Sequence, residues 1–484
     1  MKHMKQIYLI SILSLSMLLA GCKNNKNNNG SSVIDNGSSS SQTSLPDESS
    51  EDPVPEGKVR FHIPASLNEK KNEYKLDIDF DVNIFKQEAT SFHKDLAILS
   101  FGSALTNQNK ELIEGFFDNM GFDNGYACEY YDVKPTEESI GYYISHIKVD
   151  NDDLIAVSIR GWNYEKEWSS NLKMGETGNH QGFDESATIV YNKLQEYISA
   201  NYTESTLKLW IAGYSRAGGV SNVLASKILS NTDIEVEPEN MFVYTFEAPR
   251  GLLLENAIEY PNVFNLVNAP DIVPTIAPAA YGMYRCGIDI NTYDVNVDNI
   301  VKQFDSGITL PAFMPYEQID EEDTPLFNNE VEFTQYLISS LLKEDANWIN
   351  EEKGWTLNNT AMNTRERFVN NYQESIRYLL AMFFSLSDET VGELVSSLSG
   401  LSAILALLGE DGIYNFLKPA LEKDQVSFDD DKLKESCNTL MPKLALTVGA
   451  PLVSAFVNYG DNFTRMIDMH MPEVNLALIN NLVE

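Results

Sequence analysis

The chain has 484 residues, of which 43% are hydrophobic and 11% aromatic, so it can bury a core of substantial size. Its formal net charge is −36, from 71 acidic against 35 basic residues. This excess of negative charge opposes electrostatic binding to nucleic acid, to phosphate groups or to an anionic membrane surface, so we expect no nucleic-acid partner.

The N-terminus has the pattern of an export signal. Two lysines precede an apolar stretch over residues 7–20, which is too short to span a bilayer comfortably. The stretch ends in Leu-Ala-Gly-Cys, residues 19–22, which resembles the lipobox of bacterial lipoproteins. That resemblance implies a signal peptide over residues 1–22, lipid modification of Cys22 and an extracytoplasmic location at the cell membrane. Ordinary secretion with a chance cysteine is the alternative.

A low-complexity segment follows the cysteine. Residues 23–57 are rich in Asn, Ser, Gly, Asp and Pro and cannot bury enough apolar surface to fold. We interpret the segment as a disordered tether, which as a flexible chain reaches roughly 30 Å from its anchor.

Acidic and apolar residues alternate over residues 77–83, with Glu88 further on. A calcium loop and a half-buried strand both explain this alternation. Val82 stands where a calcium loop needs glycine, so we predict a strand and no metal site. The cysteines beyond Cys22 have no metal-ligand spacing and allow at most one disulfide, and we expect them to pack as small hydrophobic side chains: Cys128, Cys286 and Cys437.

An apolar run at residues 207–212 predicts a buried strand, and the segment Gly213-Tyr214-Ser215-Arg216-Ala217-Gly218-Gly219 follows it directly. Small residues on both sides of Ser215 allow a sharp turn from strand to helix, which is the pattern of a nucleophile elbow. A serine attacks carbonyl groups only when a base takes its proton, so the sequence should also contain a histidine and an acid.

Candidates for both follow the elbow in the expected order. Strands are predicted at residues 242–246 and 263–268, and Asp271 comes just after the second. Open parallel sheets present functional groups at the carboxyl ends of their strands, which favours Asp271 as the acid; a turn aspartate after proline is the alternative. Among six histidines only His470 lies downstream of Asp271, so His470 is the candidate base.

Five blocks in this order resemble the lipase class 3 family of α/β-hydrolases, in the divergent form found in secreted bacterial proteins. They are residues 155–172, the His-Gln-Gly-Phe segment at 180–183, the elbow at 213–219, and the segments at 245–250 and 268–274. The resemblance covers roughly residues 90–290 and the C-terminal histidine region. Three residues depart from it: Ala217 ends the elbow pattern in place of glycine, glycine is commoner at Glu247, and a small hydroxyl residue is frequent at Trp162.

The resemblance implies an α/β-hydrolase fold, with a mostly parallel sheet flanked by helices. It implies that Ser215 is the nucleophile, His470 the general base and then acid, and Asp271 the residue that orients the imidazole. It also implies that the backbone amides of Arg216 and Trp162 form the oxyanion hole, and that no cofactor or metal takes part.

One histidine of the matching blocks has a different expected role. His180 precedes the nucleophile in the chain, so we expect it to act structurally at a helix start.

About 200 residues separate Asp271 from His470, which is far more than one strand–helix step. Apolar residues at helical spacing predict helices at 330–342, 364–386 and 390–408, which we interpret as a cap inserted into the fold. Residues 397–408 are apolar almost all round and predict a buried helix or the cover of an acyl pocket. A second membrane anchor is disfavoured, because polar and small residues interrupt the run.

The predicted domain organisation combines these segments. After the signal peptide and the tether, the hydrolase core occupies residues 58–310, the helical cap 311–450 and the C-terminal part of the core, with His470, 451–484.

The predicted function is that of a membrane-anchored serine hydrolase, a monomer, that cleaves carboxylic esters such as acylglycerols or related lipid esters. Two other classes remain open. One is a non-catalytic envelope-binding lipoprotein that retains the fold, and the other is a peptidase or acyltransferase that uses the same triad.

Overall fold

The computed structural model describes most of the predicted core and part of the predicted cap. It covers residues 53–131, 139–164, 167, 170–171, 173–175, 178–202, 206–275, 282–314, 327–335, 375, 377–379, 381–382, 385–387, 389–390, 393–394, 411–444 and 461–483. Cys22, the signal segment and most of the tether lie outside these ranges. Within them, every helix is too short or too polar to cross a membrane.

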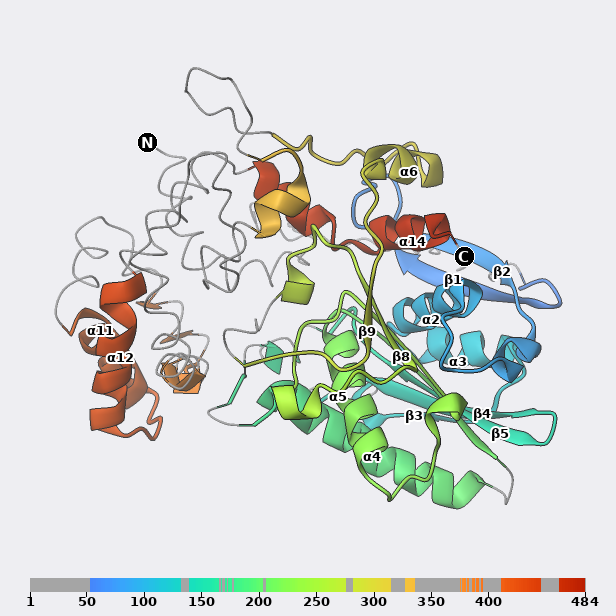
Figure 1. Ribbon diagram of the computed structural model, residues 1–484, viewed down its shortest axis with the longest axis horizontal. Coiled ribbons are helices and arrows are strands. Elements are labelled where there is room, and N and C mark those ends of the chain that lie inside the picture. Colours follow the sequence, from blue (N-terminus) through green and yellow to red (C-terminus); the bar gives the residue numbers. More distant parts are fainter. Residues whose placement is uncertain are drawn as a thin grey trace, which may run out of the picture.

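A seven-stranded sheet forms the centre of the fold (Figure 1). In spatial order it contains β3 (Asp123–Ala127), β4 (Tyr142–Val149), β5 (Asp152–Ile159), β6 (Leu207–Tyr214), β7 (Met241–Phe246), β8 (Val263–Val267) and β9 (Ile288–Asn291). β3, β4 and β5 pair antiparallel, whereas β5 to β9 pair parallel. The predicted strands after residue 200 are confirmed, and the mostly parallel sheet flanked by helices is the predicted α/β-hydrolase fold.

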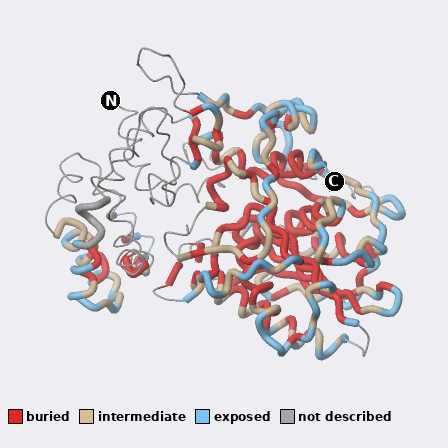
Figure 2. The backbone as a smooth tube through the Cα atoms, in the orientation of Figure 1, coloured by how far each residue is buried: buried red, intermediate tan, exposed pale blue. Residues whose placement is uncertain are grey.

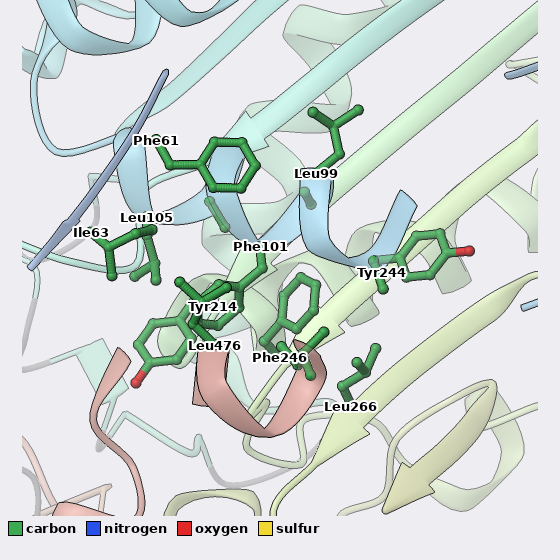
Figure 3. Packing of buried hydrophobic residues seen from close by; sticks show 14 of the residues in the cluster. Phe61, Ile63, Leu99, Phe101, Leu105, Tyr214, Tyr244, Phe246, Leu266 and Leu476 are labelled. Carbon is green, nitrogen blue, oxygen red and sulfur yellow. The ribbon is translucent and has the colours of Figure 1, made fainter. Parts of the chain in front are cut away.

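Helices cover both faces of this sheet, because its central strands are apolar on both sides. On β6, Trp210 and Tyr214 belong to one core cluster and Leu209 and Ile211 to the other. The first cluster lies under α2 (Lys94–Thr106), α3 (Lys110–Asn119) and α14 (Pro472–Asn481), and Figure 3 shows its aromatic packing. The second lies under α4 (Gln181–Asn201) and α5 (Arg216–Ser230). Buried residues therefore fill the sheet and the inner helix faces (Figure 2).

Several shorter elements complete the described part of the core. After β9, α6 (Val297–Phe304) packs against α14. Short 3-10 helices include η2 (Glu129–Tyr131), η4 (Pro238–Asn240), η5 (Leu254–Asn256) and η6 (Val273–Thr275).

An antiparallel hairpin of β1 (Lys58–Pro64) and β2 (Glu73–Asp79) packs on α2 and α14, so the two ends of the core lie side by side (Figure 1). The prediction that this strand extends through residue 83 is wrong, because β2 ends at Asp79. The reason is the side chain of Asp81, which accepts a hydrogen bond from the amide of Asn83 at 2.9 Å and begins the 3-10 helix η1 (Val82–Lys86).

Between Asp271 and His470 the structure describes two long helices, α11 (Gly412–Lys423) and α12 (Asp430–Leu444), which pack on each other. Of the predicted helix at 330–342, residues 330–335 are helical, and residues 397–408 lie outside the described ranges. The Thr334 hydroxyl lies 3.4 Å from the carbonyl of Pro270, beside Asp271. The division into core and cap at residues 310 and 450 stays a prediction.

Candidate active site

Ser215 occupies a strained turn between β6 and α5. Its φ of 55° and ψ of −125° are unfavourable for a residue with a side chain, and such strain costs on the order of 1–3 kcal/mol. Its amide donates to the carbonyl of Phe246 at 2.8 Å, which holds the turn against β7. The turn requires small neighbours, because a Cβ on Gly213 would lie 2.4 Å from the carbonyl oxygen of Ala217. This is the geometry expected of a nucleophile elbow.

The structure brings together Ser215, His470 and Asp271. Nε2 of His470 lies 2.9 Å from the Ser215 hydroxyl, and Nδ1 lies 2.5 Å from a carboxylate oxygen of Asp271. Because Asp271 accepts a hydrogen bond from the Nδ1–H group, the unprotonated Nε2 faces the serine and can take its proton. Burial lowers the pKa of His470 to about 4, so the imidazole is neutral at neutral pH.

The backbone around His470 is fixed by the elements that it joins. His470 comes two residues before α14, which packs on α2. The ring of Tyr214 stacks on the imidazole with 5.2 Å between centroids, and its hydroxyl donates to the backbone carbonyl of His470. The Asn268 side chain donates to the carbonyl of Met469 at 2.8 Å. The histidine is therefore held from the β6 and β8 ends of the sheet.

Asp271 is fully buried. One of its oxygens accepts from Nδ1 of His470, and the other accepts from the amide of Val273 at 2.8 Å. These donors fix the orientation of the carboxylate toward the imidazole.

Both predicted oxyanion-hole residues lie beside the elbow. Arg216 is the first residue of α5, and the first amides of a helix have no acceptor within it. Trp162 follows Gly161, whose Cα lies so close to the elbow that a Cβ on it would be 1.9 Å from the carbonyl oxygen of Tyr214. The oxyanion role of the two amides stays a prediction.

A buried carboxylate that sequence reasoning missed connects these two segments. Glu167 accepts from Arg160, two residues before Trp162, at 2.6 Å and from the side chain of Arg216 at 3.4 Å. All three side chains are buried. Burial lowers the pKa of Arg216, and the charge of Glu167 opposes that shift. The only signal in the sequence was the place of Glu167 within the block at residues 155–172.

A second carboxyl group that sequence reasoning did not assign lies against Asp271. Glu247 follows β7 with a φ of 50°, and its side chain is buried. Its carboxyl group is hydrogen-bonded to that of Asp271. The departure from glycine at this position was the signal.

His180 lies at the start of α4 and not with the triad. Its ring stacks on Phe183 at 3.9 Å, and its Nε2 lies 3.0 Å from the carbonyl of Asn171. Burial lowers its pKa to about 3, so it is neutral. These contacts agree with the structural role expected for it.

The described residues offer little for a metal or a disulfide. Across them, no three His, Cys, Asp or Glu side chains gather in a way that could hold a metal ion. The described cysteines are buried free thiols: Cys128, Cys286 and Cys437.

The model of the lipase class 3 family matches residues 156–281, which contain the elbow and Asp271. No curated protein is similar enough in sequence to match the chain.

Solved structures of fungal lipases are similar at low identity. A fungal lipase in complex with an inhibitor is 19% identical, covers 40% of this chain and 78% of its own, and has a TM-score of 0.32. The triacylglyceride lipase of Rhizomucor miehei is 20% identical, and its match covers 42% of this chain and 80% of the lipase with a TM-score of 0.32. The lipase of Rhizopus microsporus var. chinensis is 17% identical, and its match covers 43% of this chain and 75% of the lipase with a TM-score of 0.30. The family match supports a lipase-type hydrolase, and the chain has an α/β-hydrolase fold and resembles the lipase class 3 family over residues 156–281.

Proposed function

We propose that the protein is a serine hydrolase that cleaves carboxylic esters, with lipid esters such as acylglycerols as the substrate class. The observation that carries the proposal is the continuous hydrogen-bonded chain from Ser215 through His470 to Asp271 at the end of β6. A hydroxyl 2.9 Å from a neutral imidazole is in position for general-base activation.

The proposed reaction has two halves. In the first, Nε2 of His470 takes the proton of Ser215 while the serine oxygen attacks the ester carbonyl, and the amides of Arg216 and Trp162 stabilise the oxyanion. His470 then protonates the leaving alcohol, and an acyl-enzyme forms. In the second half a water molecule, deprotonated by His470, releases the acid. Asp271 stabilises the imidazolium in both halves.

A panel of p-nitrophenyl esters of increasing acyl length tests this proposal on the full chain, with Ser215→Ala as the matched control. We expect turnover that Ser215→Ala abolishes and that depends on acyl length. Turnover that is equal in Ser215→Ala would contradict the proposed nucleophile. Transfer of the acyl group to an added alcohol instead of water would indicate an acyltransferase, and turnover of peptides alone a peptidase.

We also propose that the enzyme acts outside the cytoplasm, attached to the cell membrane through a lipid on Cys22. The pattern of residues 1–22 supports this location, and the tether at 23–57 would give the hydrolase access to lipid substrates near its anchor. Labelling of cells with a radioactive fatty acid tests the attachment. Label should enter the wild-type chain and not Cys22→Ala, and an unlabelled wild-type chain would contradict the anchor.

A further inference from the structure

Two carboxyl groups meet directly at the acid of the triad. Glu247 comes from the end of β7 and Asp271 from the segment after β8, and the two are hydrogen-bonded to each other in a fully buried site. A hydrogen bond between two carboxyl groups requires at least one proton between them, because two carboxylates would only repel. The pair therefore holds at most one negative charge.

The surrounding donors decide where that charge lies. Asp271 accepts from Nδ1 of His470 at 2.5 Å and from the amide of Val273 at 2.8 Å. Glu247 accepts from the backbone amide of Asn268, which lies 3.1 and 3.0 Å from its two oxygens. Two separate donors, one of them the imidazole, favour the carboxylate on Asp271, which leaves the proton on Glu247.

The direction of the pKa shifts agrees with this assignment. Burial, and then the charge of Asp271, hold the pKa of Glu247 well above its ordinary value. Burial also raises the pKa of Asp271, and the hydrogen bonds from Val273 and Glu247 oppose that rise only in part. Among the described residues, the titratable groups that face Glu247 are Asp271 and His470.

The backbone of Glu247 gives a second reason to assign it a role. With a φ of 50° this position suits glycine, and a side chain there is strained. Two hydrogen bonds hold the strained turn in place. The amide of Glu247 donates to the carbonyl of Leu266 at 3.0 Å, and the side chain of Glu247 accepts from the amide of Asn268. The strained turn aims the buried carboxyl group at Asp271.

We propose that Glu247 is a neutral proton donor that positions Asp271: its hydrogen bond holds the carboxylate toward His470 and keeps the triad at a single negative charge. Glu247 is a positioning residue and does not touch the substrate. The inference concerns the acid of the triad and, for its kinetic readout, rests on the function proposed above.

The first experiment does not depend on activity. We would record the infrared difference spectrum of the full chain against Glu247→Gln at neutral pH, with Ser215→Ala as the matched control. We expect the wild type and Ser215→Ala to show the carbonyl band of a buried protonated carboxyl group that Glu247→Gln lacks. The absence of a band that depends on Glu247 would overturn the assignment of the proton. Failure of the proposed hydrolase activity would leave this readout unchanged.

The second experiment compares kinetics of two variants on a soluble p-nitrophenyl ester. In Glu247→Gln the side-chain amide can still donate to Asp271 and accept from Asn268. This variant should therefore keep the wild-type kcat and pH profile. Glu247→Gly suits the positive φ but removes the donor, and misorientation of this kind lowers kcat by roughly 10- to 100-fold with KM unchanged. Because Asp271 then attracts the imidazolium more strongly, the acid limb of the profile should move to higher pH.

The kinetic outcomes separate the proposal from its alternatives. Glu247→Gln as inactive as Glu247→Gly would mean that Glu247 acts as an ionised carboxylate. Glu247→Gly with wild-type kcat and pH profile would mean that the residue has no role in positioning Asp271. Circular dichroism melting of each variant confirms that the measured protein is folded.

Discussion

The substitution Gly161→Ala tests how the oxyanion hole is built. A Cβ on Gly161 would lie 1.9 Å from the carbonyl oxygen of Tyr214 and 3.1 Å from the Cβ of Ala217. A carbon and a carbonyl oxygen ordinarily approach to about 3.3 Å, so the segment that carries Trp162 must retreat by more than about 1 Å. Backbone surrounds the contact, and no flexible side-chain end can move instead.

The retreat should remove the amide of Trp162 from the oxyanion. Loss of one such donor costs about 2.7–4 kcal/mol of transition-state stabilisation, a decrease in kcat of about 10²- to 10³-fold. We would measure kcat and KM on a p-nitrophenyl ester, where KM should change little because the donor acts on the transition state.

Gly115→Ala is the control. A Cβ on Gly115, in α3, has no atom within 4 Å, and alanine favours a helix. Wild-type kcat in folded Gly161→Ala would refute the assignment of the Trp162 amide, and an equal loss in Gly115→Ala would show that the effect is not specific.

Three further substitutions follow from buried contacts. Glu167→Gln leaves two buried arginines short of a counter-charge, so urea titration should show a free energy of unfolding lower by about 3 kcal/mol; an unchanged midpoint would contradict the ion pairs. The raised pKa of Glu247 contributes stability that is present below its ordinary pKa of 4.5 and lost as pH rises. Between pH 5 and 8 the wild type should therefore lose up to about 1.4 kcal/mol per pH unit more than Glu247→Gln, and parallel curves would argue against a buried proton. In Gly102→Ala a Cβ would lie 2.4 Å from the buried ring of Phe61, and overpacking should lower stability by about 1–3 kcal/mol in thermal unfolding; an unchanged Tm would show that the ring adjusts freely.

The centre of the fold was predictable because its signals are local. The apolar run before Ser215 forms a parallel strand that is buried on both faces, and such strands are continuous in hydrophobicity. The small residues of the elbow are required by contacts within the same few positions. His470 could be selected by elimination, since it is the only histidine after Asp271.

The missed features depend on contacts between distant segments. Glu167 and Arg216 are 49 residues apart, and nothing near either one indicates that the two side chains share a buried site. The carboxyl group of Glu247 meets Asp271 only because β7 and β8 are neighbours in the sheet. The end of β2 was missed for a local reason, because the side chain of Asp81 competes with the strand for backbone hydrogen bonds.

In the proposed mechanism Ser215 is a nucleophile activated by His470. Its most direct test is to treat the full chain with a fluorophosphonate and to locate the label by peptide mass spectrometry, with His470→Ala and Ser215→Ala beside the wild type. We expect a phosphonyl group on Ser215, formed at a rate that His470→Ala sharply reduces. A folded wild-type chain that stays unlabelled, or that is labelled at another residue, would contradict it.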